Sequence, residues 1–415
     1  MKTNMKNLLV ILFFIQLSNL TSQAQWFTQQ SGVTNHLYDM EFINRNTGWI
    51  CGTGGTILKT TNGGTNWIQQ VTNVPTKPLF GIHPVNENVV YAVGWFSTIL
   101  KTTNGGNNWI AIEDGGPPVY GNYFSVFFYN ELTGWIGENN TMGQGDVKKT
   151  TDGGMTFISS YTFGWPEDMY FKDSLNGIGV SGAANIHKTT NGGNNWISFQ
   201  LAGSGDFFRV SFINDFTGFV IGGATEILYK TTNFGQSWNN IGIIPNVTGN
   251  SIDFLNDSVG WVGGNNGIYK TINGGTNWIK QIGTGVIYTI MAINDSLVWG
   301  CSNLGRIWHT TNGGDTITSI NQISVNVPEE LELLQNYPNP FNSQTKITFI
   351  IKQSGKYSLE IYNNLGQRII EIFNKKISAG EYETTIDASD LNSGVYFYKL
   401  TGNNLSITKN FVLIK

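Results

Sequence analysis

The chain has 415 residues, of which 13% are aromatic and 13% charged, and its net charge is −4. This length predicts one large domain with a smaller one, and the aromatic content argues against a disordered protein. Only four arginines occur, so we expect no basic face and no nucleic-acid partner.

The N-terminus has the three parts of a secretory signal peptide. Lys2 and Lys6 supply positive charge, residues 8–15 form a short apolar core, and residues 22–24 provide a small-residue cleavage site. An apolar core of this length is too short to span a bilayer. We therefore predict a signal peptide over residues 1–24 and a secreted chain.

A nine-residue string, Lys-Thr-Thr-Asn-Gly-Gly-Xaa-Asn-Trp, recurs in intact or altered form along most of the chain. The copies start at Lys59, Lys101, Lys149, Lys188, Lys230, Lys270 and His309, at steps of 42, 48, 39, 42, 40 and 39 residues. A period near 40 with strand and turn residues but no helix pattern is typical of β-propeller blades. The sequence predicts an all-β, seven-bladed propeller over residues 25–317.

The first repeat predicts four short strands, over residues 37–43, 48–52, 57–61 and 66–69. In the turn before the last strand, we expect Asn62 to bond its own backbone two residues on. Gly63 and Gly64 suit positive φ angles. We expect Trp67 to fill the space between neighbouring blades near the rim.

The start of the mature chain explains how the ring closes. Residues 25–29 resemble the outer strand at 66–69, whereas the seventh repeat has Ile317 where its tryptophan is expected. We predict that Trp26 and its neighbours supply the outer strand of the seventh blade, which removes an exposed sheet edge.

The two cysteines, Cys51 and Cys301, occupy the same position in different repeats. Equivalent side chains point the same way round a ring, and packed sheets lie too far apart for a disulfide. We expect both to be free core residues.

The repeats resemble the Asp-box (BNR) pattern and the photosystem II assembly-factor propellers. Among proteins that this pattern resembles, the sialidase-like relatives use an arginine triad, a Tyr–Glu pair and an aspartate for catalysis. The propeller has only Arg45, Arg209 and Arg306, at non-equivalent blade positions, so no triad is expected. The arginine patch of the photosystem factors is also missing.

After residues 318–331, which we interpret as a linker, the pattern changes. Residues 332–415 resemble the type A C-terminal sorting domain of type IX secretion. The resemblance rests on residues spread in order through the segment: Asn336, Pro338, Asn339, Pro340, Phe341, Gly366, Gly394, Tyr396, Lys409 and Lys415. It implies a small β-sandwich recognised by the type IX secretion translocon and removed by a sortase-like protease. An ordinary accessory β-domain is the alternative.

No residue pattern predicts catalysis, a metal or a cofactor. The histidines, His36, His83, His187 and His309, lack metal-ligand spacing, and we expect solvated strand positions. Alignment of the inner strands places seven residues at one equivalent position that lines the channel: Asp39, Gly81, Ser125, Asp168, Arg209, Ser251 and Thr289. Asp39 and Asp168 would suit an acid–base pair, but blades one and four are far apart.

Binding is the better supported expectation. Propeller ligands usually meet the face that carries the blade-to-blade connections, where we place Trp95, Phe96, Tyr120 and Trp165, above Asp39, Asp168 and Arg209 in the channel. Aromatic side chains there suit sugars or peptides, or cap the blade ends. We predict a non-catalytic binding or scaffold module at the cell surface or outside the cell. The alternatives are a glycan-active hydrolase and an envelope assembly factor.

Overall fold

A computed structural model describes most of the chain. It describes residues 26–113, 121–139, 145–162, 164–201, 205–222, 227–244, 248–282, 285–314, 321–324, 330–342, 344–388, 391–403 and 405–415. The predicted signal peptide lies outside these ranges. Within them, no helix has the length and apolar character needed to cross a membrane.

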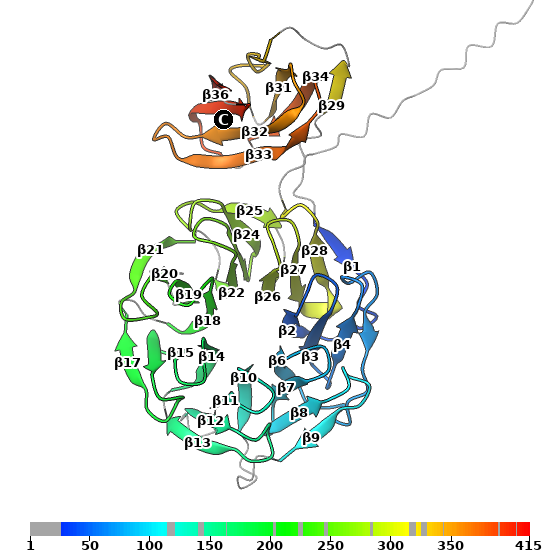
Figure 1. Ribbon diagram of the computed structural model, residues 1–415, viewed down its shortest axis with the longest axis vertical. Helices are drawn as coiled ribbons and strands as arrows, with labels where there is room; N and C mark the ends of the chain where they lie inside the picture. The colour runs from blue at the N-terminus through cyan, green and yellow to red at the C-terminus, as the bar shows by residue number, and fades with distance from the viewer. Residues whose placement is uncertain are drawn as a thin grey trace, which may run out of the picture.

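Seven four-stranded sheets surround a central channel, and two more form a separate C-terminal unit (Figure 1). The all-β class, the seven blades and the C-terminal sandwich are therefore confirmed. Each blade runs antiparallel from an inner strand at the channel to an outer strand at the rim.

The first four blades follow one another in the chain. Blade one contains β2 (Leu37–Phe42), β3 (Gly48–Gly52), β4 (Ile57–Thr60) and β5 (Ile68–Gln69). Blade two contains β6 (Leu79–Pro84), β7 (Val90–Gly94), β8 (Thr98–Thr102) and β9 (Ile110–Ile112). Blade three contains β10 (Asn122–Phe128), β11 (Gly134–Asn139), β12 (Gly145–Thr150) and β13 (Ile158–Thr162). Blade four contains β14 (Pro166–Phe171), β15 (Gly177–Ser181), β16 (Asn185–Thr189) and β17 (Ile197–Gln200).

The last three blades complete the ring. Blade five contains β18 (Phe207–Phe212), β19 (Gly218–Gly222), β20 (Ile227–Thr231) and β21 (Asn239–Ile243). Blade six contains β22 (Gly249–Phe254), β23 (Gly260–Gly264), β24 (Gly267–Thr271) and β25 (Ile279–Ile282). Blade seven contains β26 (Ile287–Ala292), β27 (Val298–Ser302), the 3-10 turn η1 (Asn303–Gly305), β28 (Ile307–Thr310) and β1 (Phe27–Gln29).

The first segment of the chain closes the ring as predicted. Strand β1 pairs with β28 and becomes the outer strand of blade seven (Figure 1). Trp26 packs against the core cluster between blades six and seven, so close to Gly314 that a side chain there would collide with it. The two ends of the propeller therefore share one sheet.

The recurring Asn-Gly-Gly turn is held by a residue that precedes it. Thr60 Oγ1 donates to Asn62 Oδ1 at 3.0 Å and accepts from Gly64 N at 2.8 Å. Asn62 Oδ1 also accepts from the backbone N–H of Asn66, four residues on rather than the predicted two. The positive φ angles of Gly63 and Gly64 are confirmed. The first threonine of the repeat is thus part of the turn mechanism.

The repeat lysine joins neighbouring blades. Lys101 Nζ lies 5.1 Å from the centre of the Tyr91 ring on its own sheet and donates to Gly153 O in the next blade at 2.7 Å. Lys59 likewise lies over Trp49 and donates to Gly105 O at 2.7 Å. Each lysine therefore connects the third strand of one blade to the turn of the next.

The seam between blades seven and one differs, because His309 occupies the lysine position. Its ring stacks on Trp299 with the centroids 4.4 Å apart. Within the described residues, His309 Nε2 and Trp299 Nε1 are buried without a hydrogen-bond partner. Gln29 crosses this seam instead, since its side chain donates to Gly63 O and accepts from Trp67 Nε1, each at 3.0 Å. Trp67 packs between these blades, as predicted.

The prediction of solvated histidines is wrong for His83 and His187, and also for His309 in the seam described above. His83 bridges Glu41 Oε2 and Phe128 O, each at 3.0 Å, and so connects three blades. His187 is only 2% exposed, and its ring nitrogens lie 2.8 Å from the hydroxyls of Ser181 and Ser198. Burial lowers the pKa of His187 to about 4. A serine hydroxyl can either donate or accept a hydrogen bond, so both nitrogens of the neutral imidazole can be paired in this buried position.

Both cysteines are buried and free, as predicted. Their Sγ atoms face backbone oxygens of the adjacent inner strands, Leu79 O for Cys51 and Leu37 O for Cys301. Burial raises the pKa of both thiols well above the ordinary value. They behave as small core residues.

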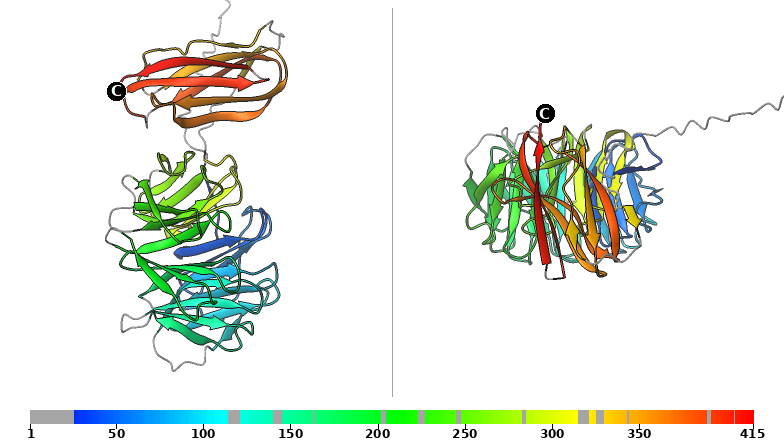
Figure 2. Two further views of the ribbon diagram at one scale, coloured as in Figure 1. Left: turned by 60° about the vertical axis from the view of Figure 1, so that its left-hand side comes forward. Right: turned by 90° about the horizontal axis from the view of Figure 1, so that it is seen from above.

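The C-terminal sandwich lies beyond the propeller rim (Figure 2). Its first sheet contains β29 (Asn321–Ser324), β34 (Gly380–Asp387), β31 (Gln344–Ile351) and β30 (Glu332–Leu333). Its second contains β33 (Arg368–Ile377), β32 (Gly355–Tyr362), β35 (Gly394–Gly402) and β36 (Leu405–Leu413). Strand β29 falls within 318–331, the predicted linker, so part of that segment belongs to the sandwich.

Candidate functional site

The seven aligned channel residues do occupy equivalent places. In every blade a β-bulge lies directly before this residue, for example between Leu37 and Asp39 in blade one and between Phe207 and Arg209 in blade five. A bulge leaves one residue outside the ladder and re-aims its side chain. The seven bulge residues, which we call the bulge ring, are Tyr38, Phe80, Phe124, Glu167, Phe208, Asn250 and Tyr288.

The channel is crossed by a polar cluster, which we call the plug: Asp39, Asp168, Arg209 and Thr289. Arg209 Nη2 lies 2.6 Å from Asp39 Oδ1 and 3.1 Å from Thr289 Oγ1. Arg209 Nη1 lies 3.7 Å from Asp168 Oδ1. Two carboxylates that the sequence places in distant blades are thus connected through one guanidinium.

Each plug carboxylate also binds the inner strand of the following blade. Asp39 Oδ2 accepts from Ile82 N, and Asp168 Oδ2 accepts from Val210 N, each at 3.0 Å. An inner strand is a sheet edge with backbone N–H groups that need partners. Burial raises the pKa of Asp168 to about 6, although Arg209 and the backbone donors act in the opposite direction. The plug therefore joins neighbouring blades.

Four members of the bulge ring form a continuous aromatic arc over blades seven, one, two and three. The ring centroids are 5.1 Å apart for Tyr288 and Tyr38, 4.9 Å for Tyr38 and Phe80, and 5.0 Å for Phe80 and Phe124. All four side chains are partly exposed. The arc lies where the inner strands begin, at the end of the channel that we call the channel mouth.

The other side of the channel mouth is acidic. Glu167 is the bulge residue of blade four, and Asp206 lies just before the inner strand of blade five. Asp206 Oδ1 accepts from Ala183 N at 3.0 Å, which places it against the corner of blade four. Burial, and then the charge of Asp206, raise the pKa of Glu167 to about 7. The channel mouth thus has a continuous aromatic side over blades seven, one, two and three, and a side over blades four and five where Glu167 and Asp206 add acidic groups beside Phe208.

The predicted surface aromatics lie around the same end of the channel. Trp95 is 40% exposed, its ring centroid is 5.7 Å from that of Phe80, and it extends the arc outward. Phe96 follows Trp95 and is 49% exposed. Trp165 is 43% exposed and precedes β14. The predicted Tyr120 lies outside the described residues.

The arc residues are not among the site residues predicted from the sequence. The aligned position is that of the plug, whereas Tyr38, Phe80, Phe124 and Tyr288 lie one residue earlier in each inner strand. Five of the seven repeats have an aromatic residue there. That regularity was the available signal, but only the bulges show that these side chains leave the blade core.

In the sandwich, the sorting-motif residues at 336–341 connect the first segment of the domain to its last two strands, β35 and β36. Asn336 is 2% exposed; its backbone N–H donates to Tyr398 Oη at 2.9 Å and its Nδ2 to Thr345 Oγ1 at 2.8 Å. Asn339 Oδ1 accepts from Val412 N at 2.9 Å. Phe341 is buried and packs against Phe411 of the last strand.

The remaining sorting-motif residues lie at turns or on β35 and β36. Pro338 O accepts from Asn336 and Thr345, and Pro340 precedes the buried Phe341. Gly366 has a φ of +76° in the turn before β33, and Gly394 begins β35. Three further members complete the set. The Tyr396 ring stacks on Phe411, and Lys409 lies opposite Tyr398 in the ladder between β35 and β36. The backbone N–H of Lys415 donates to Ser393 Oγ.

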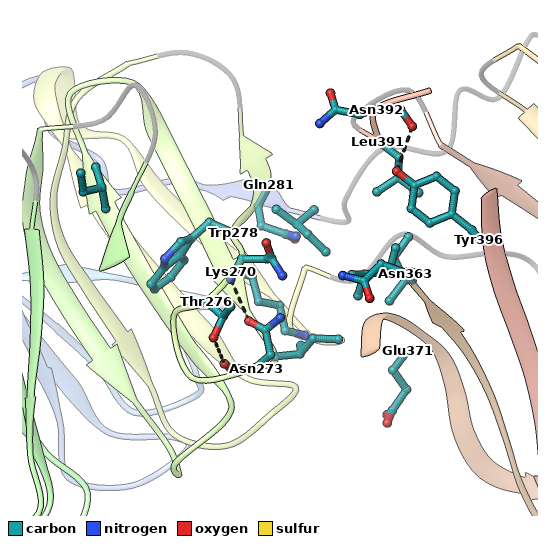
Figure 3. A pocket seen from close by; sticks show the side chains of 16 residues that line it. Lys270, Asn273, Thr276, Trp278, Gln281, Asn363, Glu371, Leu391, Asn392 and Tyr396 are labelled. Atoms are coloured by element: carbon teal, nitrogen blue, oxygen red, sulfur yellow. Dashed lines mark hydrogen bonds between the residues drawn. The ribbon is translucent and has the colours of Figure 1, made fainter. Parts of the chain in front are cut away.

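A pocket of about 500 Å³ lies between blade six and the sandwich (Figure 3). Trp278, Asn273 and Gln281 line its propeller side, whereas Tyr396 and Leu391 line its sandwich side. Because seven of its sixteen lining residues come from the sandwich, this pocket exists only while the two domains remain attached. The channel mouth, in contrast, belongs to the propeller alone.

Comparisons with known proteins agree with this architecture. A family model described as photosynthesis system II assembly factor YCF48 matches residues 18–157 and 161–327. A second, described as secretion system C-terminal sorting domain, matches residues 335–415. No curated protein sequence matches the chain.

Several solved propellers are similar in fold. YCF48 bound to D1 peptide is 18% identical, with 69% of this chain and 96% of that one covered at a TM-score of 0.58. YCF48 from Cyanidioschyzon merolae is 16% identical, with 69% and 98% covered at a TM-score of 0.58. The WD40 β-propeller domain of Doa1 is 11% identical, with 68% and 96% covered at a TM-score of 0.54.

At these identities the likeness to solved structures concerns the fold alone. The family models go further, because the first covers most of the chain and the second covers nearly all of the sandwich. The chain therefore belongs to the YCF48 family of photosynthesis system II assembly factors, and it carries the C-terminal sorting domain of proteins exported by type IX secretion.

Proposed function

We propose that the chain is a non-catalytic binding module, delivered to the cell surface or the medium, that holds a glycan or protein ligand at the channel mouth. The observation that carries this proposal is the aromatic arc of Tyr288, Tyr38, Phe80 and Phe124. Its rings lie 4.9–5.1 Å apart and remain partly exposed. Exposed contiguous aromatic surface favours ligand stacking or anchoring.

The polar groups beneath the arc support a structural role rather than catalysis. Asp39 and Asp168 accept backbone N–H groups of neighbouring blades and also contact Arg209. A general acid or base has to exchange a proton with substrate. Carboxylates that already hold the blades together are poorly placed for that exchange.

The proposed export route depends on the C-terminal sandwich. We propose that residues 332–415 contact the type IX translocon and are cleaved by a sortase-like protease, after which the propeller alone remains at its destination. The family match to a sorting domain supports this route. The solved relative described as bound to D1 peptide supports a polypeptide as one ligand class for the propeller.

A combined glycan and peptide array probed with the full-length chain tests the proposal. The double variant Tyr38→Ala with Phe80→Ala removes the centre of the arc, and we expect at least about tenfold weaker binding. The control is Phe216→Ala, a residue that is 59% exposed in a turn at the opposite end of the channel. Equal binding by the double variant and the wild type would reject the channel mouth as the ligand site.

A further inference from the structure

The charges around the channel mouth restrict the sign of the charge that a ligand can carry. Four carboxylates gather there, on Asp39, Glu167, Asp168 and Asp206, against the single guanidinium of Arg209. That guanidinium is 2.6 Å from Asp39 and 3.7 Å from Asp168, so its charge is already matched. An anionic ligand would meet uncompensated negative charge, whereas a cation would be attracted.

The aromatic arc favours the same kind of group. The faces of Tyr and Phe rings attract a cation within about 6 Å of the ring centroid. Glu167 and Asp206 lie on the opposite side of the opening, so one cation there would have ring faces on one side and carboxylates on the other. A neutral sugar could stack on the rings and donate its hydroxyls to the carboxylates, but it would leave their negative charge uncompensated.

The plug limits how far a ligand can enter from the channel mouth. A channel cavity of about 200 Å³ is lined by the plug and by residues that follow it in the inner strands, such as Glu41 and Asp253, whereas Tyr38, Phe80, Tyr288 and Glu167 are not among its lining residues. The plug therefore separates this cavity from most of the bulge ring. A polypeptide that rests on the aromatic arc can place the end of one side chain above the plug, beside Glu167.

We propose that the channel mouth recognises a polypeptide by inserting one of its basic side chains, preferably arginine, between the aromatic arc and Glu167. This inference rests on the proposed binding function and names the ligand class. Arginine is preferred because its planar guanidinium stacks on aromatic rings and donates to carboxylates at the same time.

The test uses the full-length chain and short Gly/Ser peptides displayed at high density on a sensor surface. One peptide carries a central arginine, and its matched control carries citrulline, which keeps the shape but not the charge. We expect at least about tenfold stronger binding to the arginine peptide, decreasing with added salt. The same glycan and neutral-peptide array serves as the parallel measurement.

Three variants assign that binding to the channel mouth. Phe80→Leu keeps apolar volume but lacks the ring face, and Glu167→Gln removes the carboxylate; each is expected to weaken arginine-peptide binding about threefold or more. Asp257→Asn, an exposed acidic residue beside Lys230, is the control and is expected to bind like the wild type. Unfolding curves of each variant establish that the propeller is folded.

The outcomes separate this inference from the proposed function. Equal binding to arginine and citrulline, or no binding to either, overturns the basic side chain as the ligand. If arginine binding fails in this way but glycan or neutral-peptide binding depends on Tyr38 and Phe80, the proposed binding function stands and only the basic side chain is rejected. Arginine-peptide binding that is unchanged by both Phe80→Leu and Glu167→Gln overturns the channel mouth as its site.

Discussion

Arg209 in blade five reaches across the channel to Asp39 in blade one, where Nη2 lies 2.6 Å from Oδ1. Removal of the guanidinium would leave Asp39 and Asp168 without their cation in a largely buried place. Breaking a fully buried pair costs about 3–5 kcal/mol. Since the Arg209 side chain is 25% exposed, we expect Arg209→Gln to lower the free energy of unfolding by about 2 kcal/mol.

Urea unfolding followed by tryptophan fluorescence measures this loss. Every tryptophan lies between Trp26 and Trp308, so the signal reports the propeller and not the sandwich. Arg306→Gln, at an exposed corner of blade seven, is the matched control and should change stability by less than about 0.5 kcal/mol. Equal stability of Arg209→Gln and the wild type would show that the plug does not connect the blades.

The seam between blades seven and one should gain stability from the repeat lysine. His309→Lys places an ammonium over Trp299 and within reach of the turn of blade one, as Lys101 does over Tyr91 with Gly153 O. We expect a gain of about 1 kcal/mol in the free energy of unfolding. The reciprocal change, Lys101→His, should lose a similar amount. A gain from both substitutions would contradict the account of the blade connection.

The buried histidine of blade four predicts a specific pH dependence. The pKa of His187 falls to about 4 on folding, below the ordinary value of 6.5. Between these values the unfolded chain takes up a proton that the folded chain does not, so stability decreases as pH falls from 6.5 to 4. Relative to His187→Gln, the wild type should lose about 2 kcal/mol between pH 7 and pH 5. A difference that stays constant with pH would exclude this linkage.

The sorting domain depends on Asn336, which holds the start of the sandwich to Thr345 and Tyr398. Asn336→Ala leaves the Thr345 hydroxyl without this donor in a buried place, and we expect about 2 kcal/mol lower stability of the sandwich. Export should decrease because a smaller fraction of the sorting domain would be folded when it contacts the translocon. Immunoblots of cell and medium fractions, in a host with type IX secretion, measure it. Asn364→Ala, in an exposed turn, should be exported like the wild type.

The ring itself was predictable because each repeat carries its own turn residues. The step of about forty residues, the copies starting at Lys59 and ending at His309, and the strand-like segment at 25–29 together required seven sheets and a shared last blade. These features are local in sequence. They need no knowledge of how distant side chains meet.

The channel could be predicted only in part, since its chemistry depends on contacts between blades. Alignment placed Asp39, Asp168 and Arg209 at one level, but the ring distance between blades one and four argued against their meeting. The length of the Arg209 side chain overcomes that distance. The outward turn of Tyr38 and Phe80 follows from bulges, which the alternating pattern of a strand does not reveal.

Site-resolved crosslinking tests the central claim most directly. Benzoylphenylalanine replaces Phe80 at the channel mouth in one full-length protein and Phe216 at the opposite end of the channel in another. Each protein is illuminated on the array components that the wild type binds. The account predicts covalent adducts from position 80 and none from position 216. Adducts from position 216 with none from position 80 would contradict it.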